Sequence, residues 1–179
     1  MDINKEKELV ERAKYDTVAF GELYDQYYSR IYGYSLRRTA SVQIAEDVTS
    51  EVFLKVLKNL RKFCWRDVPF SSWLYRIASN EIANYYNKNG NGHISLDKTS
   101  GALDDIELIN ADNELKKYDE YIVLHENISK LSIKYQEVIV LRFFEDKQVK
   151  EIGEILGKSE GTVKSLLHRG LEKLAKLTG

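Results

Sequence analysis

The chain has 179 residues, a net charge of −1 and 43% hydrophobic residues, which suits one or two soluble domains with real cores. No apolar stretch approaches the roughly 20 residues of a membrane span, and the charged N-terminus lacks the apolar core of a signal peptide. Cys64 is the single cysteine, the three histidines are scattered, and no P-loop or dinucleotide motif occurs. We therefore expect a cytoplasmic protein that is not an enzyme and needs no metal or other cofactor.

Residues 1–88 predict a helical module, because the chain has one proline and long runs of apolar residues at helical spacing. The four expected helices are Lys5–Tyr15, Thr17–Thr39, Ser41–Phe63 and a helix from Pro69 to about Tyr86. The apolar stripe of the second helix includes Tyr24, and that of the third includes Leu57. Proline is tolerated in a first helical turn, so Pro69 suits the start of the fourth helix.

Residues 89–120 predict a flexible acidic linker, which is extended or partly helical. Its first part is rich in asparagine and glycine and forms helix poorly. Residues 90–128 carry a net charge of −6, whereas residues 1–89 carry +2 and residues 129–179 carry +3. Affinity for DNA follows the number of phosphates neutralised, so neither basic module holds DNA tightly alone. This charge division implies a partner that supplies most of the grip on DNA.

Residues 121–179 predict a second helical module that ends in a helix-turn-helix. Helices through residues 124–131 and 133–146 precede the segment 150–174. Gly157 can adopt the left-handed conformation that ends a helix, and Ser159 can cap the next one. Helix, glycine-containing turn and helix form the DNA-binding pattern, although a helical hairpin with no nucleic acid gives the same signal.

The last helix has two distinct faces when its residues are placed 100° apart. The apolar side is expected to pack on the preceding helix and consists of Val163, Leu167, Gly170, Leu171 and Leu174. The other side combines small and hydrogen-bonding residues with cations, which suits a major groove. Its candidate DNA contacts are Ser159, Gly161, Thr162, Lys164, Ser165, His168 and Arg169. An ordinary solvated face is the alternative, and Glu172 fits that alternative better.

Four segments in order carry a resemblance to a known family. They are FGELYDQYYSRIYGYSLRRT, AEDVTSEVFLKVLKNL, PFSSWLYRIASNEIANYY and LSIKYQEVIVLRFFEDKQVKEIGEILGKSEGTVKSLLHRGLEKL. Together they resemble regions 2 and 4 of bacterial RNA polymerase sigma factors, in the small extracytoplasmic-function (ECF) group of the sigma-70 family. The resemblance implies an all-α protein with a four-helix region 2-like domain, residues 1–88, and a region 4-like helix-turn-helix domain, residues 121–179.

The resemblance also implies partners. The third helix would bind the β′ clamp helices of core RNA polymerase, and its exposed candidates are Glu46, Asp47, Ser50, Glu51 and Lys55. A solvated charged face is the alternative for these residues. The helix-turn-helix domain would dock on the β flap and read the promoter −35 element. The acidic linker would thread toward the active-site and RNA-exit channels, although acidic linkers also serve solubility alone. A cognate anti-sigma factor is a further partner that such proteins often have.

For the −10 element, the resemblance implies promoter melting by the loop before the fourth helix and by that helix. Capturing an unstacked base needs aromatic or cationic surfaces. The candidates are Phe63, Trp65, Arg66, Arg76 and Asn80. The alternative for Phe63 and Trp73 is a place in the core, which we expect for Trp73, whereas we expect Trp65 to be exposed. Two rival functions are a stand-alone dimeric helix-turn-helix regulator and an enzyme with a helical DNA-binding tail.

Overall fold

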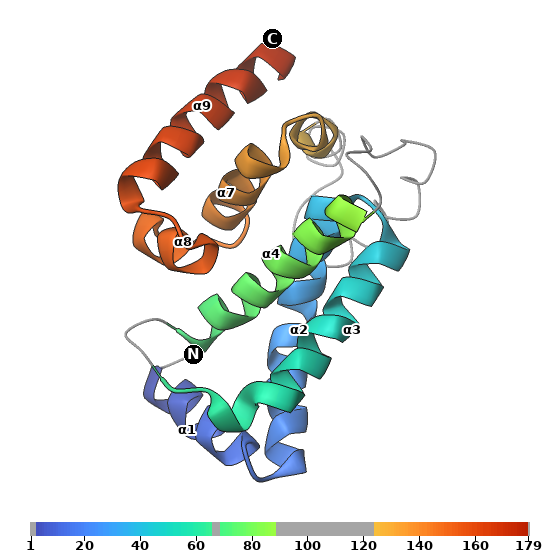
Figure 1. The fold of residues 1–179 in the computed structure, drawn as a ribbon, viewed down its shortest axis with the longest axis vertical. Coiled ribbons are helices and arrows are strands. Elements are labelled where there is room, and N and C mark those ends of the chain that lie inside the picture. Colours follow the sequence, from blue (N-terminus) through green and yellow to red (C-terminus); the bar gives the residue numbers. More distant parts are fainter. Residues whose placement is uncertain (1–2, 66–68, 89–123, 179) are drawn as a thin grey trace, which may run out of the picture.

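The computed structural model describes residues 3–65, 69–88 and 124–178, and within these ranges it contains helices and no strand. The linker predicted at residues 89–120 lies outside the described residues. Residues 124–129 are also helical. The remaining elements, shown in Figure 1, are α1 (Ile3–Ala13), α2 (Thr17–Thr39), α3 (Val42–Asn59), a 3-10 turn (Leu60–Lys62), α4 (Phe70–Lys88), α7 (Ile133–Phe143), α8 (Val149–Leu156) and α9 (Glu160–Thr178).

Side-chain caps explain where the N-terminal helices begin. The Asp16 carboxylate accepts the Val18 backbone N–H at 2.9 Å and starts α2, while the Ser41 hydroxyl accepts the Ile44 N–H at 3.5 Å and starts α3. Ala40 ends α2 in the left-handed conformation, at φ 49°. The predicted bounds of α2 are therefore confirmed at both ends. The predicted third helix instead ends at Asn59 and continues as the 3-10 turn.

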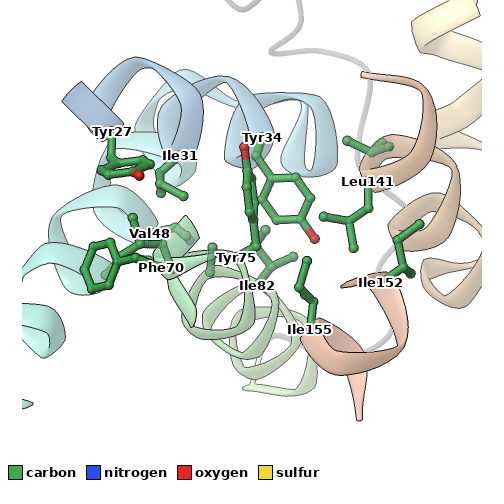
Figure 2. Packing of buried hydrophobic residues seen from close by; sticks show 14 of the residues in the cluster. Tyr27, Ile31, Tyr34, Val48, Phe70, Tyr75, Ile82, Leu141, Ile152 and Ile155 are labelled. Atoms are coloured by element: carbon green, nitrogen blue, oxygen red, sulfur yellow. The ribbon is translucent and has the colours of Figure 1, made fainter. Parts of the chain in front are cut away.

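The N-terminal module is a bundle of α1–α4 around an apolar core. Tyr27, Ile31, Val48 and Phe70 lie in this core, and all are at most 5% exposed (Figure 2). Two residues of the predicted stripes lie outside it. Leu57 is 55% exposed and Tyr24 is 37% exposed. The helical stripe identifies apolar residues but does not determine which of them a neighbouring helix covers.

Buried polar groups tie α2 to α4. Tyr34 and Ser79 share a hydrogen bond of 2.8 Å between their hydroxyls, and the Arg38 guanidinium donates to the Tyr34 hydroxyl at 2.7 Å. The Tyr86 hydroxyl donates to the Arg38 carbonyl at 3.0 Å. Buried polar groups require such partners, so this network fixes the register of the two helices.

The C-terminal module packs on the N-terminal module, with α8 against α4 and α7 against α2. Leu141, Ile152 and Ile155 face Tyr34 and Tyr75 in one continuous apolar cluster (Figure 2). The sequence pattern predicts two modules but does not predict that they share this core. Among the described helices, none is both long and apolar enough to cross a membrane.

Candidate nucleic-acid interface

The turn between α8 and α9 has the geometry predicted from the sequence. Gly157 ends α8 in the left-handed conformation at φ 64°, which a glycine adopts without steric cost. The Ser159 hydroxyl accepts the Thr162 backbone N–H at 3.2 Å and caps α9. Upstream, the Gln148 N–H donates to the Glu151 carboxylate at 3.0 Å and stabilises the start of α8.

Gly153 is a second glycine that this turn requires, and the sequence reasoning missed it. A Cβ placed on Gly153 would lie 2.7 Å from the Lys158 carbonyl oxygen, which is backbone and cannot swing away. The Lys158 N–H donates to the Gly153 carbonyl at 2.9 Å, so the turn folds back directly onto this position. The signal was a glycine inside the otherwise apolar face of the first helix of the motif.

The predicted DNA-facing side of α9 is open to solvent. All seven candidate residues are exposed: Ser159, Gly161, Thr162, Lys164, Ser165, His168 and Arg169. Both serine hydroxyls form hydrogen bonds within the helix, since Ser159 caps its N-terminus and Ser165 donates to the Gly161 carbonyl at 3.0 Å. Arg169 and Lys164 form no ion pair within the described ranges, and they are therefore the cations of this face that can bind phosphates or base edges.

On the opposite side of α9, fewer apolar residues are buried than the sequence predicts. Val163, Gly170 and Leu174 are buried, as expected. Leu167 is half-buried, and Leu171 is 41% exposed, so the expectation that Leu171 packs inside is wrong. Helices α7 and α8 cover only a narrow strip of α9, so most of the surface of α9 is accessible to solvent.

A cleft of about 500 Å³ lies between the loop after α3, the first turns of α4 and the end of α8. It brings together Phe63 and Arg76, two of the predicted −10 contacts. Its other lining residues include Lys55, Lys62 and Trp73. Aromatic rings and cations around one cleft are the groups that bind single-stranded nucleic acid.

The aromatic side chains of this loop pack on one another, so they are only partly accessible to a ligand. Phe63 packs on Phe70 and Trp73, with ring centroids 5.2 and 4.8 Å away. Trp65 is half-buried and meets the edge of Phe63 at 6.2 Å, so it is less exposed than expected. Trp73 is also half-buried and lines the cleft, so its assignment to the core is only partly right.

The remaining −10 candidates differ in their surroundings. Asn80 is exposed on α4, one turn beyond Arg76. The Arg76 guanidinium donates from Nε to the Ile155 carbonyl at 3.3 Å and from Nη2 to the Glu154 carbonyl. Arg66 lies outside the described residues. The structure thus gathers Phe63 and Arg76 at the cleft and places Asn80 on the same helix as Arg76.

The candidate polymerase-binding residues of α3 form two groups. Glu46, Asp47, Ser50 and Glu51 are exposed. Lys55 is half-buried instead, lines the cleft and pairs with Glu81 of α4 at 2.5 Å. Lys55 therefore belongs with the cleft rather than with the acidic residues of the helix.

Two leucines extend the acidic side of α3. Leu54 is 42% exposed and Leu57 is 55% exposed, and they continue the helical spacing of Asp47 and Ser50. Exposed apolar residues beside charged ones are typical of protein-binding surfaces. Leu57 belongs to the apolar stripe predicted for this helix, but the structure places it on this exposed surface.

Two family models match the two helical modules of the chain. Residues 23–91 match the family model of sigma-70 region 2, and residues 122–174 match that of sigma-70 region 4. The ECF RNA polymerase sigma factor SigW of Bacillus subtilis is 34% identical over 186 residues, covering 98% of this chain and 97% of the relative. The sigma factor BldN of Streptomyces coelicolor is 34% identical over 174 residues, which cover 95% of this chain and 64% of BldN.

Solved structures share the fold. CnrH, in complex with the cytosolic domain of CnrY, gives a TM-score of 0.71 at 21% identity, covering 97% of this chain and 96% of CnrH. The sigma factor RpoE from Bartonella quintana, in complex with the anti-sigma factor NepR, gives 0.68 at 18% identity, covering 89% and 96%. The fold and the helix-turn-helix define a two-module all-helical protein with the architecture of a sigma factor. The chain belongs to the sigma-70 family of RNA polymerase sigma factors, in its ECF group.

Proposed function

We propose that this chain binds core RNA polymerase and directs promoter-specific transcription initiation. The observation that carries the proposal is the exposed, cationic face of α9 at the end of a capped helix-turn-helix, in a chain that matches regions 2 and 4 of one family. The chain would carry specificity, while the polymerase performs the chemistry. Its place of action is then the cytoplasm, where polymerase and promoter DNA meet.

In the proposed division of labour, residues 121–179 read the −35 element. The N-terminal end of α9 enters the major groove, where Arg169 and Lys164 reach phosphates or guanine edges. Thr162, Ser165 and His168 supply the hydrogen bonds of the reading face. His168 Nε2 lies 3.5 Å from the Glu172 carboxylate on the same exposed face.

Residues 1–88 would read and open the −10 element. The cleft offers Phe63 and Arg76 to an unstacked strand, with Trp65 at the edge of the aromatic cluster and Asn80 further along α4. The acidic and leucine-containing side of α3 would bind the β′ clamp helices, and the C-terminal module would dock on the β flap. Residues 89–120 connect the two readers in this proposal.

An anti-sigma factor is a further proposed partner. Two structures with this fold contain a bound partner chain, the cytosolic domain of CnrY on CnrH and the anti-sigma factor NepR on RpoE. A pull-down from cells that make the tagged chain tests this partner directly.

Transcription with purified core polymerase on a promoter library tests the main proposal. The expected result is initiation at a defined set of promoters only when the chain is present. The rival dimeric regulator predicts no such initiation and tight dimeric binding to duplex DNA without polymerase. That combination of results would reject the proposal.

The −35 role is tested on the promoters selected in that experiment. Arg169→Ala should lower transcription by about 5- to 150-fold, because one good base or phosphate contact contributes about 1–3 kcal/mol. Lys176→Ala is the matched control, since it removes an exposed cation from the same helix two turns further on. Binding to core polymerase should stay unchanged in both variants. Equal transcription by the Arg169 variant and the wild type would remove Arg169 from the reading face.

A further inference from the structure

The loop before α4 carries the single cysteine of the chain, at the edge of the cleft. Cys64 is exposed and lines the cleft together with Phe63 and Trp73. Its Sγ lies 3.8 Å from the Lys62 carbonyl oxygen, a weak contact for a thiol. A small molecule that enters the cleft therefore meets an accessible thiol beside two aromatic rings.

The charged residues that line the cleft are mostly cations. They are Lys55, Lys62 and Arg76, with Glu154 as the carboxylate among them. Lys55 is paired with Glu81, and Arg76 donates to the end of α8, so both cations already have partners. Lys62 is exposed and forms no ion pair within the described ranges. Lys62 is therefore the cation with which an anionic group in the cleft would pair.

A separate observation shows that one wall of the cleft lacks a polar partner. Ser72, Trp73, Arg76 and Ile77 line the cleft at helical spacing, so they share one side of α4. Ser72 is 3% exposed, and its hydroxyl has no hydrogen-bond partner among the described residues. Buried hydroxyls nearly always have a partner. The Ser72 hydroxyl thus points to a polar ligand that supplies the missing hydrogen bond.

The cleft has a volume of about 500 Å³, which lies in the range of pockets that hold small molecules. We propose that Cys64 is a reversible modification site, where it forms a mixed disulfide with a small disulfide of the glutathione type. In the adduct, a carboxylate of the bound half pairs with Lys62, and a polar group meets the Ser72 hydroxyl.

The reaction is a thiol–disulfide exchange. The Cys64 thiolate attacks one sulfur of the small disulfide, whose S–S bond breaks as the new S–S bond to Cys64 forms. The departing thiolate takes up a proton, which balances the one that Cys64 released. Cys64 is thereby oxidised, and the small disulfide is reduced to one free thiol and the half that stays bound. Attack by a second small thiol reverses the step.

The adduct would regulate the proposed −10 site. Cys64 directly follows Phe63, and both line the cleft with Arg76. A group the size of a tripeptide on Cys64 would cover Phe63 and Arg76, and its carboxylates would repel the phosphates of a DNA strand. This consequence rests on the proposed function, whereas the modification is measurable without polymerase or DNA.

The reaction rates of two disulfide reagents measure whether the cleft selects its partner. Glutathione disulfide carries carboxylates, while 2-hydroxyethyl disulfide is uncharged and reports the reactivity of the thiol alone. The ratio of the two rates, from mass spectrometry of the intact chain, should be about fivefold higher for Cys64 than for a reference thiol. The reference is Ala175→Cys in the Cys64→Ser background, because Ala175 is exposed on α9 and lies outside the cleft. Equal ratios would show an ordinary accessible cysteine and overturn the proposal.

Two variants test the contacts of the adduct. Lys62→Gln should lower the rate ratio at Cys64 about fivefold, because it removes one charge contact. Lys58→Gln is its control, since Lys58 is an exposed cation of α3 outside the cleft. Ser72→Ala should make the adduct about 2- to 10-fold easier to reduce in a glutathione buffer, because one hydrogen bond is lost. If neither variant differs from the wild type, the cleft does not hold the adduct and the proposed site is wrong.

Transcription on the selected promoters tests the regulatory part. The chain is treated with glutathione disulfide, freed of the reagent and added to core polymerase. Initiation should fall by about 5- to 150-fold, the effect of losing one base-stacking contact, and should return after reduction of the adduct. The same treatment of Cys64→Ser should leave the activity of that variant as it was before treatment. Full initiation by the modified chain would overturn the regulatory part. No initiation by the untreated chain would reject the proposed function, whereas the rate ratios would still decide the modification site.

Discussion

The two modules differ in how much of each long helix they cover. Buried residues occur along α2 from Ala19 to Thr39, whereas α9 buries only Val163, Gly170 and Leu174 of its 19 residues. The N-terminal module therefore has a core of its own. The C-terminal module keeps its longest helix accessible and obtains part of its burial from α2 and α4. A long helix with most of its surface exposed adds little to the core of its module, and the neighbouring module supplies part of the missing burial.

The largest expected effect comes from removing the same side chain in each module. Leu74 of α4 is fully buried, whereas Leu171 of α9 is 41% exposed. Leu74→Ala should lower the free energy of unfolding by about 2–5 kcal/mol, because it loses burial and leaves a cavity. Leu171→Ala should cost less than about 1 kcal/mol. Urea denaturation followed by circular dichroism measures both. Similar losses of unfolding free energy would mean that neighbouring helices cover Leu171 about as closely as they cover Leu74.

A titration at the junction shows whether the C-terminal module depends on its neighbour. His125 is 3% exposed, and burial together with the positive charge of Arg37 lowers its pKa from 6.5 to about 4. A lowered histidine pKa stabilises the fold above pH 6.5, and that stability is lost as the pH falls toward 4. The full effect is about 3 kcal/mol, of which about 2 kcal/mol falls between pH 7 and 5.

The measurement for His125 is urea denaturation at pH 7 and pH 5, for the wild type and for His125→Gln. Glu145 acts in the opposite direction, because its raised pKa favours proton uptake in the folded state as the pH falls. Both proteins retain Glu145, so the difference between their pH dependences isolates His125. Identical pH dependence in the two proteins would exclude the predicted role.

Alanine substitutions at two glycines should have opposite effects on stability, because Gly153 lies against a tight turn of the C-terminal module and Gly21 lies on an open face of α2. Gly153→Ala should cost about 1–3 kcal/mol, since its Cβ would meet the Lys158 carbonyl at 2.7 Å. Gly21→Ala in α2 should stabilise by about 0.5–1 kcal/mol, because nothing lies within 4 Å of that Cβ and alanine favours helix. Thermal denaturation measures both. A tolerated alanine at 153 would mean that the turn relaxes without loss.

Local chemistry made much of each module predictable from the sequence. Asp16 and Ser159 are residues that cap helices well, and Gly157 is the residue that ends one in the left-handed conformation. The exposed face of α9 also followed from its spacing. Leu57 and Leu171 were misplaced because a helical stripe includes every apolar residue, whether or not another helix covers it.

The junction between the modules was not predictable in the same way. Arg37 and Glu145 are 108 residues apart, and no periodicity connects them. The sequence makes Arg76 a candidate DNA contact, whereas its hydrogen bonds to the end of α8 depend on how the two modules pack. Long-range polar contacts of this kind have no local signature, so the sequence predicts the two modules but not the contacts between them.

The smallest expected effect concerns the ends of two helices, one in each module. Both α2 and α8 end in the left-handed conformation, but α2 uses Ala40 at φ 49° and α8 uses Gly157 at φ 64°. Gly157→Ala should cost about 1 kcal/mol, because a Cβ is strained there and nothing offsets it in the open turn.

The reverse change, Ala40→Gly, should stay within about 0.5 kcal/mol of the wild type. Relief of the same strain is offset by the loss of a buried methyl group, since Ala40 is 5% exposed, and by the greater freedom of glycine in the unfolded chain. Urea denaturation of both variants measures this asymmetry. A clear rise in the free energy of unfolding for Ala40→Gly would show that packing does not offset the strain at Ala40. The contrast between a well-covered and a sparsely covered module would then not extend to the ends of their helices.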